Sequence, residues 1–118
     1  VVAGGAMMGP AVENLSYPTT KTTSGLIFLS KAAAEPAPVN PCIRCGRCVE
    51  YCPMGLEPVE VNQAYAARDV QELGKLHAAY CFSCGSCAFV CPAKRPCTQM
   101  MGLAKAFYLG EIKKGGNK

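Results

Sequence analysis

Tryptophan is absent from this 118-residue chain, and only nine of its residues are Phe or Tyr. A domain of this length with so few large aromatic side chains can bury only a modest apolar core. The longest apolar run, residues 1–12, is too short to span a membrane and contains three Gly and one Pro. It also lacks the basic start of a signal peptide. The sequence therefore predicts neither a transmembrane helix nor a secretory leader.

Histidine occurs once and acidic residues number eight, and none of these groups is placed in a pattern typical of acid–base or nucleophilic catalysis. We expect no catalytic residue in this chain. The formal net charge of +4 counts every thiol as neutral. Eight metal-bound thiolates and two positively charged cluster cores would bring the balance close to zero. Basic residues are also not interleaved with aromatic ones, so no nucleic-acid partner is predicted.

Cysteine, by contrast, is abundant, with nine residues in the chain. Eight of them form two copies of the pattern C-x₂-C-x₂-C-x₃-C-P, at residues 42–53 and 81–92. The copies are offset by 39 residues and share six of twelve positions. This spacing is that of bacterial two-cluster ferredoxins, in which four thiolates hold each 4Fe–4S cluster. A Gly between the second and third Cys allows the backbone to approach the cluster closely.

In two-cluster ferredoxins the fourth Cys of each copy ligates the other cluster. We therefore assign the first 4Fe–4S cluster to Cys42, Cys45, Cys48 and Cys91. The second 4Fe–4S cluster takes Cys81, Cys84, Cys87 and Cys52. Neither cluster is complete until the two copies have come together, so this assignment couples metal binding to folding.

Two other interpretations of the cysteines are less consistent with the sequence. A disulfide framework does not suit an odd count arranged as two identical quartets. Structural zinc prefers separated C-x₂-C pairs, two pairs to each metal, and fits Cys triplets poorly. So many free thiols indicate a reducing compartment.

The predicted fold is mostly α: a helical, ferredoxin-like domain with two 4Fe–4S clusters at residues 41–118, preceded by an extended or β arm at residues 1–40. Within the arm, residues 1–3 and 25–29 have the composition of strands, and residues 32–38 that of a linker. Helices are predicted over residues 46–51, from Pro58, from Asp69 through Tyr80, and from Pro96. The last of these is expected to be capped by Gly115.

Four residues outside the quartets are candidates for a role. Cys97 lies on the predicted apolar stripe of the last helix, which favours a buried free thiol over a ligand. His77 lies on a similar stripe and is predicted to pack there, with one edge exposed. Arg44 and Arg47 stand where the second copy has Ser83 and Ser86. Positive charge near a cluster favours its reduced form, so we expect the first cluster to have the higher potential.

The whole chain resembles the C-terminal part of the C subunit of the Rnf electron-transport complex. The matching segments are residues 4–9 (GGAMMG), 18–23 (PTTKTT), 42–48 (CIRCGRC), 52–56 (CPMGL) and 91–96 (CPAKRP). Cys97 departs from the family, which tends to carry an ordinary apolar residue there.

The resemblance implies that residues 1–40 follow a β-grasp (SLBB-like) region and that FMN and NADH bind in a part of the parent chain absent here. It implies a peripheral subunit on the cytoplasmic side of the inner membrane, without membrane insertion of its own. Its partners would be other Rnf-type subunits, including a ferredoxin-like iron–sulfur subunit. The parent complex would be an ion-translocating NADH:ferredoxin oxidoreductase, whereas this chain alone would be no enzyme.

Three alternative functions remain open at this point. A cobalamin reductase shares the order of flavin, β-grasp and dicluster regions. The clusters of a structural or docking module would only hold the fold. A soluble ferredoxin-like carrier would fit the cysteines but not the N-terminal arm.

Overall fold

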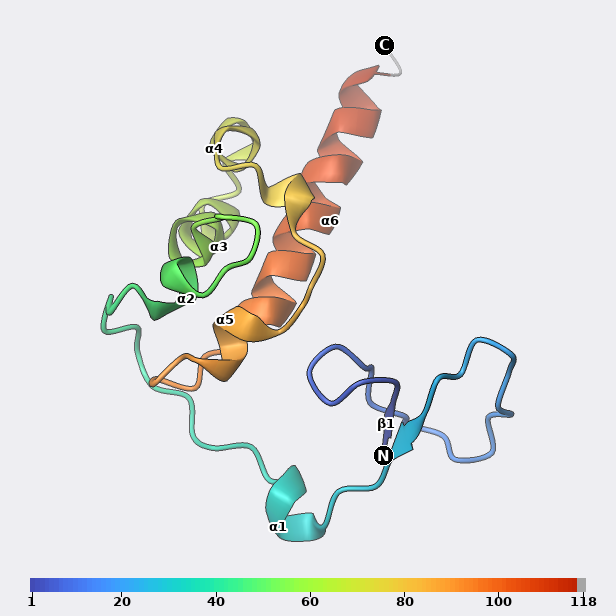
Figure 1. The fold of residues 1–118 in the computed structure, drawn as a ribbon. Coiled ribbons are helices and arrows are strands. Elements are labelled where there is room, and N and C mark those ends of the chain that lie inside the picture. The colour runs from blue at the N-terminus through green and yellow to red at the C-terminus, as the bar shows by residue number, and fades with distance from the viewer. Residues whose placement is uncertain (117–118) are drawn as a thin grey trace. The chain divides into compact units, whose positions relative to one another are not determined.

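The computed structural model describes residues 1–116, which divide into two units, Val1–Pro38 and the residues from Val39 onward (Figure 1). The described chain is mostly helical, with one two-stranded sheet among residues 1–116, as the sequence predicts. The prediction that the first unit follows a β-grasp region stays a prediction.

The first unit is built around a short antiparallel ladder. Strand β1 (Val2–Ala3) pairs with β2 (Leu26–Ile27), and the Gly4 N–H extends the pairing by donating to the Gly25 carbonyl at 2.8 Å. Gly9 is packed so closely that a Cβ there would lie 2.5 Å from the Ala3 carbonyl oxygen, so only Gly fits. Both strands lie within the predicted strand segments.

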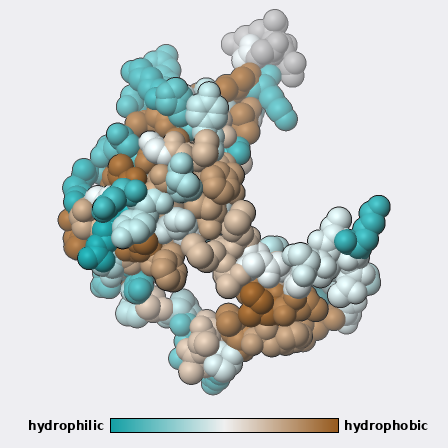
Figure 2. Space-filling view, viewed as in Figure 1, coloured by the Kyte–Doolittle hydropathy of each residue, from teal (hydrophilic) through white to brown (hydrophobic). Residues whose placement is uncertain are grey.

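A short helix, α1 (Lys31–Ala34), follows the sheet and overlaps the start of the segment predicted as a linker, residues 32–38. The Ser30 hydroxyl caps it by accepting from the Ala33 N–H at 3.3 Å. Figure 2 shows an extended hydrophobic area on this unit, and large apolar side chains such as Met8, Leu26 and Phe28 are indeed exposed.

In the second unit, the regular elements of residues 39–116 are all helices joined by loops. Its elements in chain order are α2 (Arg47–Glu50), α3 (Pro58–Ala66), α4 (Val70–Lys75), the 3-10 helix η1 (Ala78–Tyr80), α5 (Ser86–Phe89) and α6 (Cys97–Gly116). The long helix α6 is the common support, because α3, α4, η1 and α5 all pack against it (Figure 1). Helices α2 and α5 belong to the two cysteine loops and also contact each other.

The core of this unit is small and lies between α6 and the shorter helices. Its members are Leu56, Val61, Ala64, Leu73, Ala78, Cys87, Cys97, Met101 and Ala104. The edge of the core is closed by Tyr65 and Phe107, whose rings meet edge to face with centroids 5.8 Å apart. The Arg68 guanidinium lies 4.5 Å from the centroid of the Tyr65 ring and covers this pair from outside. The packing fixes α3 and α6 beside one another.

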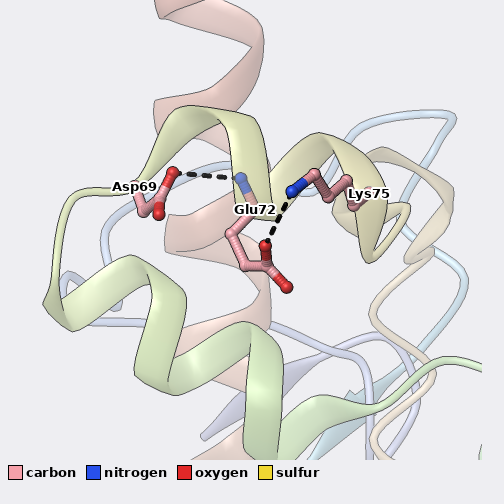
Figure 3. A network of polar contacts seen from close by, with 3 residues as sticks. All are labelled: Asp69, Glu72 and Lys75. Carbon is pink, nitrogen blue, oxygen red and sulfur yellow. Dashed lines mark hydrogen bonds and ion pairs between the residues drawn. The ribbon is translucent and has the colours of Figure 1, made fainter.

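The start of α4 follows the predicted cap. The Asp69 carboxylate accepts from the Glu72 N–H at 3.0 Å (Figure 3). The Glu72 side chain does not return the contact but turns toward Lys75, with 3.5 Å between Oε2 and Nζ (Figure 3). The capping interaction is therefore one-sided.

Three sequence predictions in this unit are wrong. The helix expected from Asp69 through Tyr80 is broken at His77, whose φ of 55° is left-handed, and only the short η1 follows it. His77 is consequently exposed, stacked on the exposed Tyr80 at 5.4 Å between ring centroids, and does not pack in the core. Gly115 is not a cap, because α6 continues to Gly116.

We predict that Leu73→Ala lowers the free energy of unfolding by about 3 kcal/mol, because Leu73 is fully buried and its truncation leaves a cavity. The check is the denaturant midpoint followed by circular dichroism under anaerobic conditions. Leu103→Ala is the matched control, since Leu103 is 55% exposed, and it should shift the midpoint little. Equal effects of the two variants would contradict the described core.

Candidate metal centre

The first cysteine loop is shaped by two left-handed residues. Arg44 has φ 52° and Gly46 has φ 78°, and Gly46 then serves as the N-cap of α2. The turn brings the Arg44 N–H to 3.4 Å from Cys42 Sγ. Backbone donors of this kind stabilise a thiolate, which is the form that binds metal.

The second loop repeats this geometry. Ser83 has φ 57° and Gly85 has φ 87°, and the Ser83 N–H lies 3.4 Å from Cys81 Sγ. The two loops thus have the same conformation at equivalent positions, although only the Gly residues adopt such φ values without strain. That two non-Gly residues also do so indicates that the geometry is imposed by the site.

The predicted first quartet surrounds a single cavity. Cys42, Cys45 and Cys48 from the first loop and Cys91 from the second line a space of about 410 Å³. Its other walls come from α3, the chain after Cys91 and the start of α6. The volume falls in the usual range for small-ligand sites. The structure therefore brings together thiols that are as much as 49 residues apart in the sequence.

The predicted second quartet lies against the core. Cys87 is buried in it, and Cys81 and Cys52 border it, whereas Cys84 lies by Ser86 with 3.4 Å between Sγ and Oγ. Cys52 Sγ is approached by the Leu56 N–H at 3.4 Å, and Cys87 Sγ lies 3.5 Å from Thr98 Oγ1. Each of these sulfurs therefore has a polar neighbour inside the protein.

The thiols do not titrate alike. Burial raises the pKa of Cys48 and of Cys87, although nearby hydrogen bonds oppose this in both cases. At Cys91 burial also raises the pKa, but hydrogen bonds from Arg95, Ala93 and other neighbours outweigh it and lower the pKa overall. The Ser86 hydroxyl lowers the pKa of Cys84. Metal ligation would offset the burial effect at Cys48 and Cys87 by balancing the thiolate charge.

The arrangement does not suit a single metal ion. Among residues 1–116, no three His, Cys, Asp or Glu side chains converge closely enough to hold one ion. A 4Fe–4S cluster makes a different demand, because each thiolate binds a separate iron and the four sulfurs stay apart. Four separated thiols around one cavity fit that group.

Asn62 gives a second indication that the first cavity suits a 4Fe–4S cluster. This residue of α3 also lines the first cavity, and its Oδ1 is shielded from solvent without a hydrogen-bond partner. A half-turn of the carboxamide exchanges oxygen and nitrogen and so presents an N–H donor in the same place. An unpartnered amide on a thiol-lined wall fits a cavity that receives a hydrogen-bond acceptor, as cluster sulfides are.

Cys97 is enclosed in the core next to these thiols. Burial and the neighbouring Cys91 and Cys87 raise the pKa of the Cys97 thiol to about 12. It is therefore a neutral thiol at physiological pH, which is consistent with a packing role.

Comparison with known proteins gives the same picture. A family model described as a 4Fe-4S dicluster domain matches residues 41–94. The C subunit of the ion-translocating oxidoreductase complex of Rhodobacter capsulatus is 42% identical over 76 residues, which are 64% of this chain and 15% of that protein. The C subunit of the Na(+)-translocating ferredoxin:NAD(+) oxidoreductase complex of Acetobacterium woodii is 39% identical over 70 residues, 59% of this chain and 16% of that protein.

A further relative is the C subunit of the proton-translocating ferredoxin:NAD(+) oxidoreductase complex of Clostridium ljungdahlii. It is 45% identical over 58 residues, which are 49% of this chain and 13% of that protein. Over its dicluster region this chain is similar to the C subunits of these complexes. The predicted resemblance is thereby confirmed, and the dicluster region carries it. The aligned parts span 13–16% of the length of these three relatives.

The chain's described part contains no helix that is both long and apolar enough to cross a membrane.

The two arginines of the first cysteine loop differ in environment. Arg44 Nη1 lies 3.5 Å from Glu60 Oε1, and both residues line the first cavity, whereas Arg47 borders a separate hollow beside Tyr51 and Phe89. Glu60 therefore offsets part of the charge that Arg44 brings to the first site. The order of the two potentials stays a prediction.

Sequence reasoning missed Asn62, Glu60 and Thr98 as parts of the sites. A signal was available, because the 39-residue offset of the two loops continues past their prolines. It aligns the start of α3 with the start of α6 and places Val59 opposite Thr98. Val59 lines the first cavity and Thr98 contacts Cys87, so the repeated unit includes the helix that follows each loop.

We predict that Asn62→Leu lowers the reduction potential of one cluster without loss of iron, because a hydrogen bond to a cluster sulfur favours the reduced form. Leu has nearly the same shape but no donor. The measurement is a potentiometric titration followed by EPR. Gln63→Leu is the control, since Gln63 is an exposed amide at the same cavity. An unchanged potential in Asn62→Leu would remove the proposed hydrogen bond.

Proposed function

We propose that this chain is an electron-transfer module that carries two 4Fe–4S clusters within an Rnf-type oxidoreductase complex. The observation that carries the proposal is the cavity formed by Cys42, Cys45, Cys48 and Cys91. Three of these thiols come from one loop and the fourth from the other, as the spacing of two-cluster ferredoxins requires. The match to a dicluster family model and to the C subunits of ion-translocating complexes supports it.

In this proposal the protein holds the two clusters, shields them from water and tunes their reduction potentials. When bound, each cluster supplies a reversible one-electron change. The left-handed turns at Arg44 and Ser83 direct backbone N–H groups toward the thiols. The core around Cys87 and Met101 limits the access of water on the inner side. Four thiolates would leave no iron open to substrate, so the clusters would conduct electrons without acting as catalytic centres.

With crossed ligation, both clusters would be held within the second unit. Helices α2 and α5 contact each other, and Cys87 lies in the core that Cys91, assigned to the other site, borders. A short distance between clusters favours fast electron exchange.

We further propose that the complete protein connects an NADH- and flavin-binding region with a ferredoxin-like partner subunit, as a peripheral component on the cytoplasmic side of the membrane. The names of the relatives, which include ferredoxin:NAD(+) oxidoreductase complexes, support this assignment.

The other functions considered from the sequence receive less support. The relatives described above belong to ion-translocating complexes, which favours this context over a cobalamin reductase. A purely structural module would hold clusters that do not accept electrons reversibly at physiological potentials. Electron uptake therefore separates that class from the proposed one.

The proposal is tested by pairs of Cys→Ser substitutions and by counting the electrons taken up. The wild type is expected to accept two electrons reversibly. If ligation is crossed, Cys52→Ser with Cys84→Ser damages only the second cluster, and about one electron is still accepted. Cys52→Ser with Cys45→Ser damages both clusters and abolishes the uptake by intact 4Fe–4S centres.

The two double variants serve as controls for each other, because each removes two thiols and one of them is Cys52. The opposite result, with uptake retained only in the Cys52/Cys45 variant, would show that each loop fills its own cluster. No reversible uptake in the iron-loaded wild type would contradict electron transfer and favour the structural module.

A further inference from the structure

The helix that follows each cysteine loop lies directly beneath that loop. On α6, Thr98 Oγ1 lies 3.5 Å from Cys87 Sγ. One turn later, a Cβ built on Gly102 would lie 3.9 Å from the Ser83 hydroxyl. Lys105 follows, and its ammonium group donates to the Cys81 carbonyl at 2.7 Å. Residues 98, 102 and 105 are spaced by four and three, so they form one stripe along the helix.

The same stripe exists on α3 beneath the first loop. The 39-residue offset aligns Thr98, Gly102 and Lys105 with Val59, Gln63 and Ala66, and these three residues all line the cavity of the first quartet. The repeated architecture is thus preserved in the supporting helices. The side chains differ at all three positions, but only the third introduces a charge, where Lys105 in one copy corresponds to Ala66 in the other.

Lys105 is held firmly in this position. Its neighbour Ala104 and the preceding Met101 are buried in the core, so the helix backbone beneath the loop is fixed. Lys105 itself is half-buried, and the three ion pairs between described side chains do not include it. Its charge is therefore not offset by a carboxylate in direct contact. At the first site, by comparison, Arg44 is paired with Glu60.

We propose that Lys105 is a positioning residue that raises the reduction potential of the second cluster. The inference rests on the proposed function, since it presumes a cluster on Cys81, Cys84, Cys87 and Cys52. A cluster becomes more negative when it is reduced, and a nearby fixed cation stabilises that form. Partial burial limits the screening of the cation by solvent. The hydrogen bond to the Cys81 carbonyl keeps the ammonium group beside the first ligand of the loop.

The proposal makes a reciprocal prediction for the two copies. Lys105→Met keeps the length of the side chain but removes the charge, and it should move one of the two reduction waves to lower potential. Ala66→Lys places a cation at the equivalent position of the first site, and it should move the other wave to higher potential. Because Ala66 is exposed at the edge of the cavity, a lysine can be accommodated there.

Two further variants separate charge from geometry. Lys105→Arg retains the charge and should keep the potential near that of the wild type. Lys105→Gln can still donate a hydrogen bond but is neutral, and it should lower the potential as Lys105→Met does. Lys113→Met removes an exposed lysine from the same helix and should leave both waves unchanged. Should Lys105→Met fail to fold, Lys105→Gln and Ala66→Lys still test the proposal.

The experiment is a potentiometric titration of each variant followed by EPR, after iron and sulfide have been counted in every sample. The proposal is overturned if Lys105→Gln retains the wild-type potential, if both waves move together in Lys105→Met, or if neither wave moves. These outcomes differ from failure of the proposed function, in which the iron-loaded wild type would show no reversible wave.

Discussion

The second unit depends on one constraint. In each cysteine loop the first three thiols lie together, and the fourth lies apart from them, toward the three thiols of the other loop. The structure meets this constraint around the first cavity, where Cys91 arrives from the other loop to join Cys42, Cys45 and Cys48. Small helical domains with a modest core commonly need such a staple. Here the buried side chains are few, and the largest that are fully buried are Leu73, Met101, Val61 and Pro58. Metal binding and folding are therefore expected to be coupled.

The repeat is larger than the cysteine pattern that reveals it. Equivalent φ values at Arg44 and Ser83, at Gly46 and Gly85, and at Gly55 and Lys94 show that the backbone is duplicated through the turn after the fourth Cys. The helices α3 and α6 continue the duplication as supports beneath the loops. Their lengths differ, since α3 ends at Ala66 whereas α6 continues to Gly116. Within this duplicated frame, differences in side chains are what distinguish the two sites.

The sequence was sufficient for the parts of the fold that have strong local signals. The cysteine spacing predicted the loops, Pro58 and Asp69 predicted two helix starts, and the apolar stripe predicted α6. The sequence-based predictions failed where tertiary packing determines the conformation of the chain. Nothing in the residues around His77 marks the left-handed break that redirects the chain from α4 into η1 and toward Cys81. The contact of Lys105 with the Cys81 carbonyl joins residues 24 apart, so no local pattern indicates it.

The most direct test of the account is the content of iron and acid-labile sulfide per chain after anaerobic purification, with an EPR spectrum of the reduced protein. Two 4Fe–4S clusters would give about eight irons and eight sulfides, with the signal of two reduced clusters that interact magnetically. Zinc without sulfide would contradict it, because the quartets would then hold structural metal ions and the chain would have no electrons to transfer.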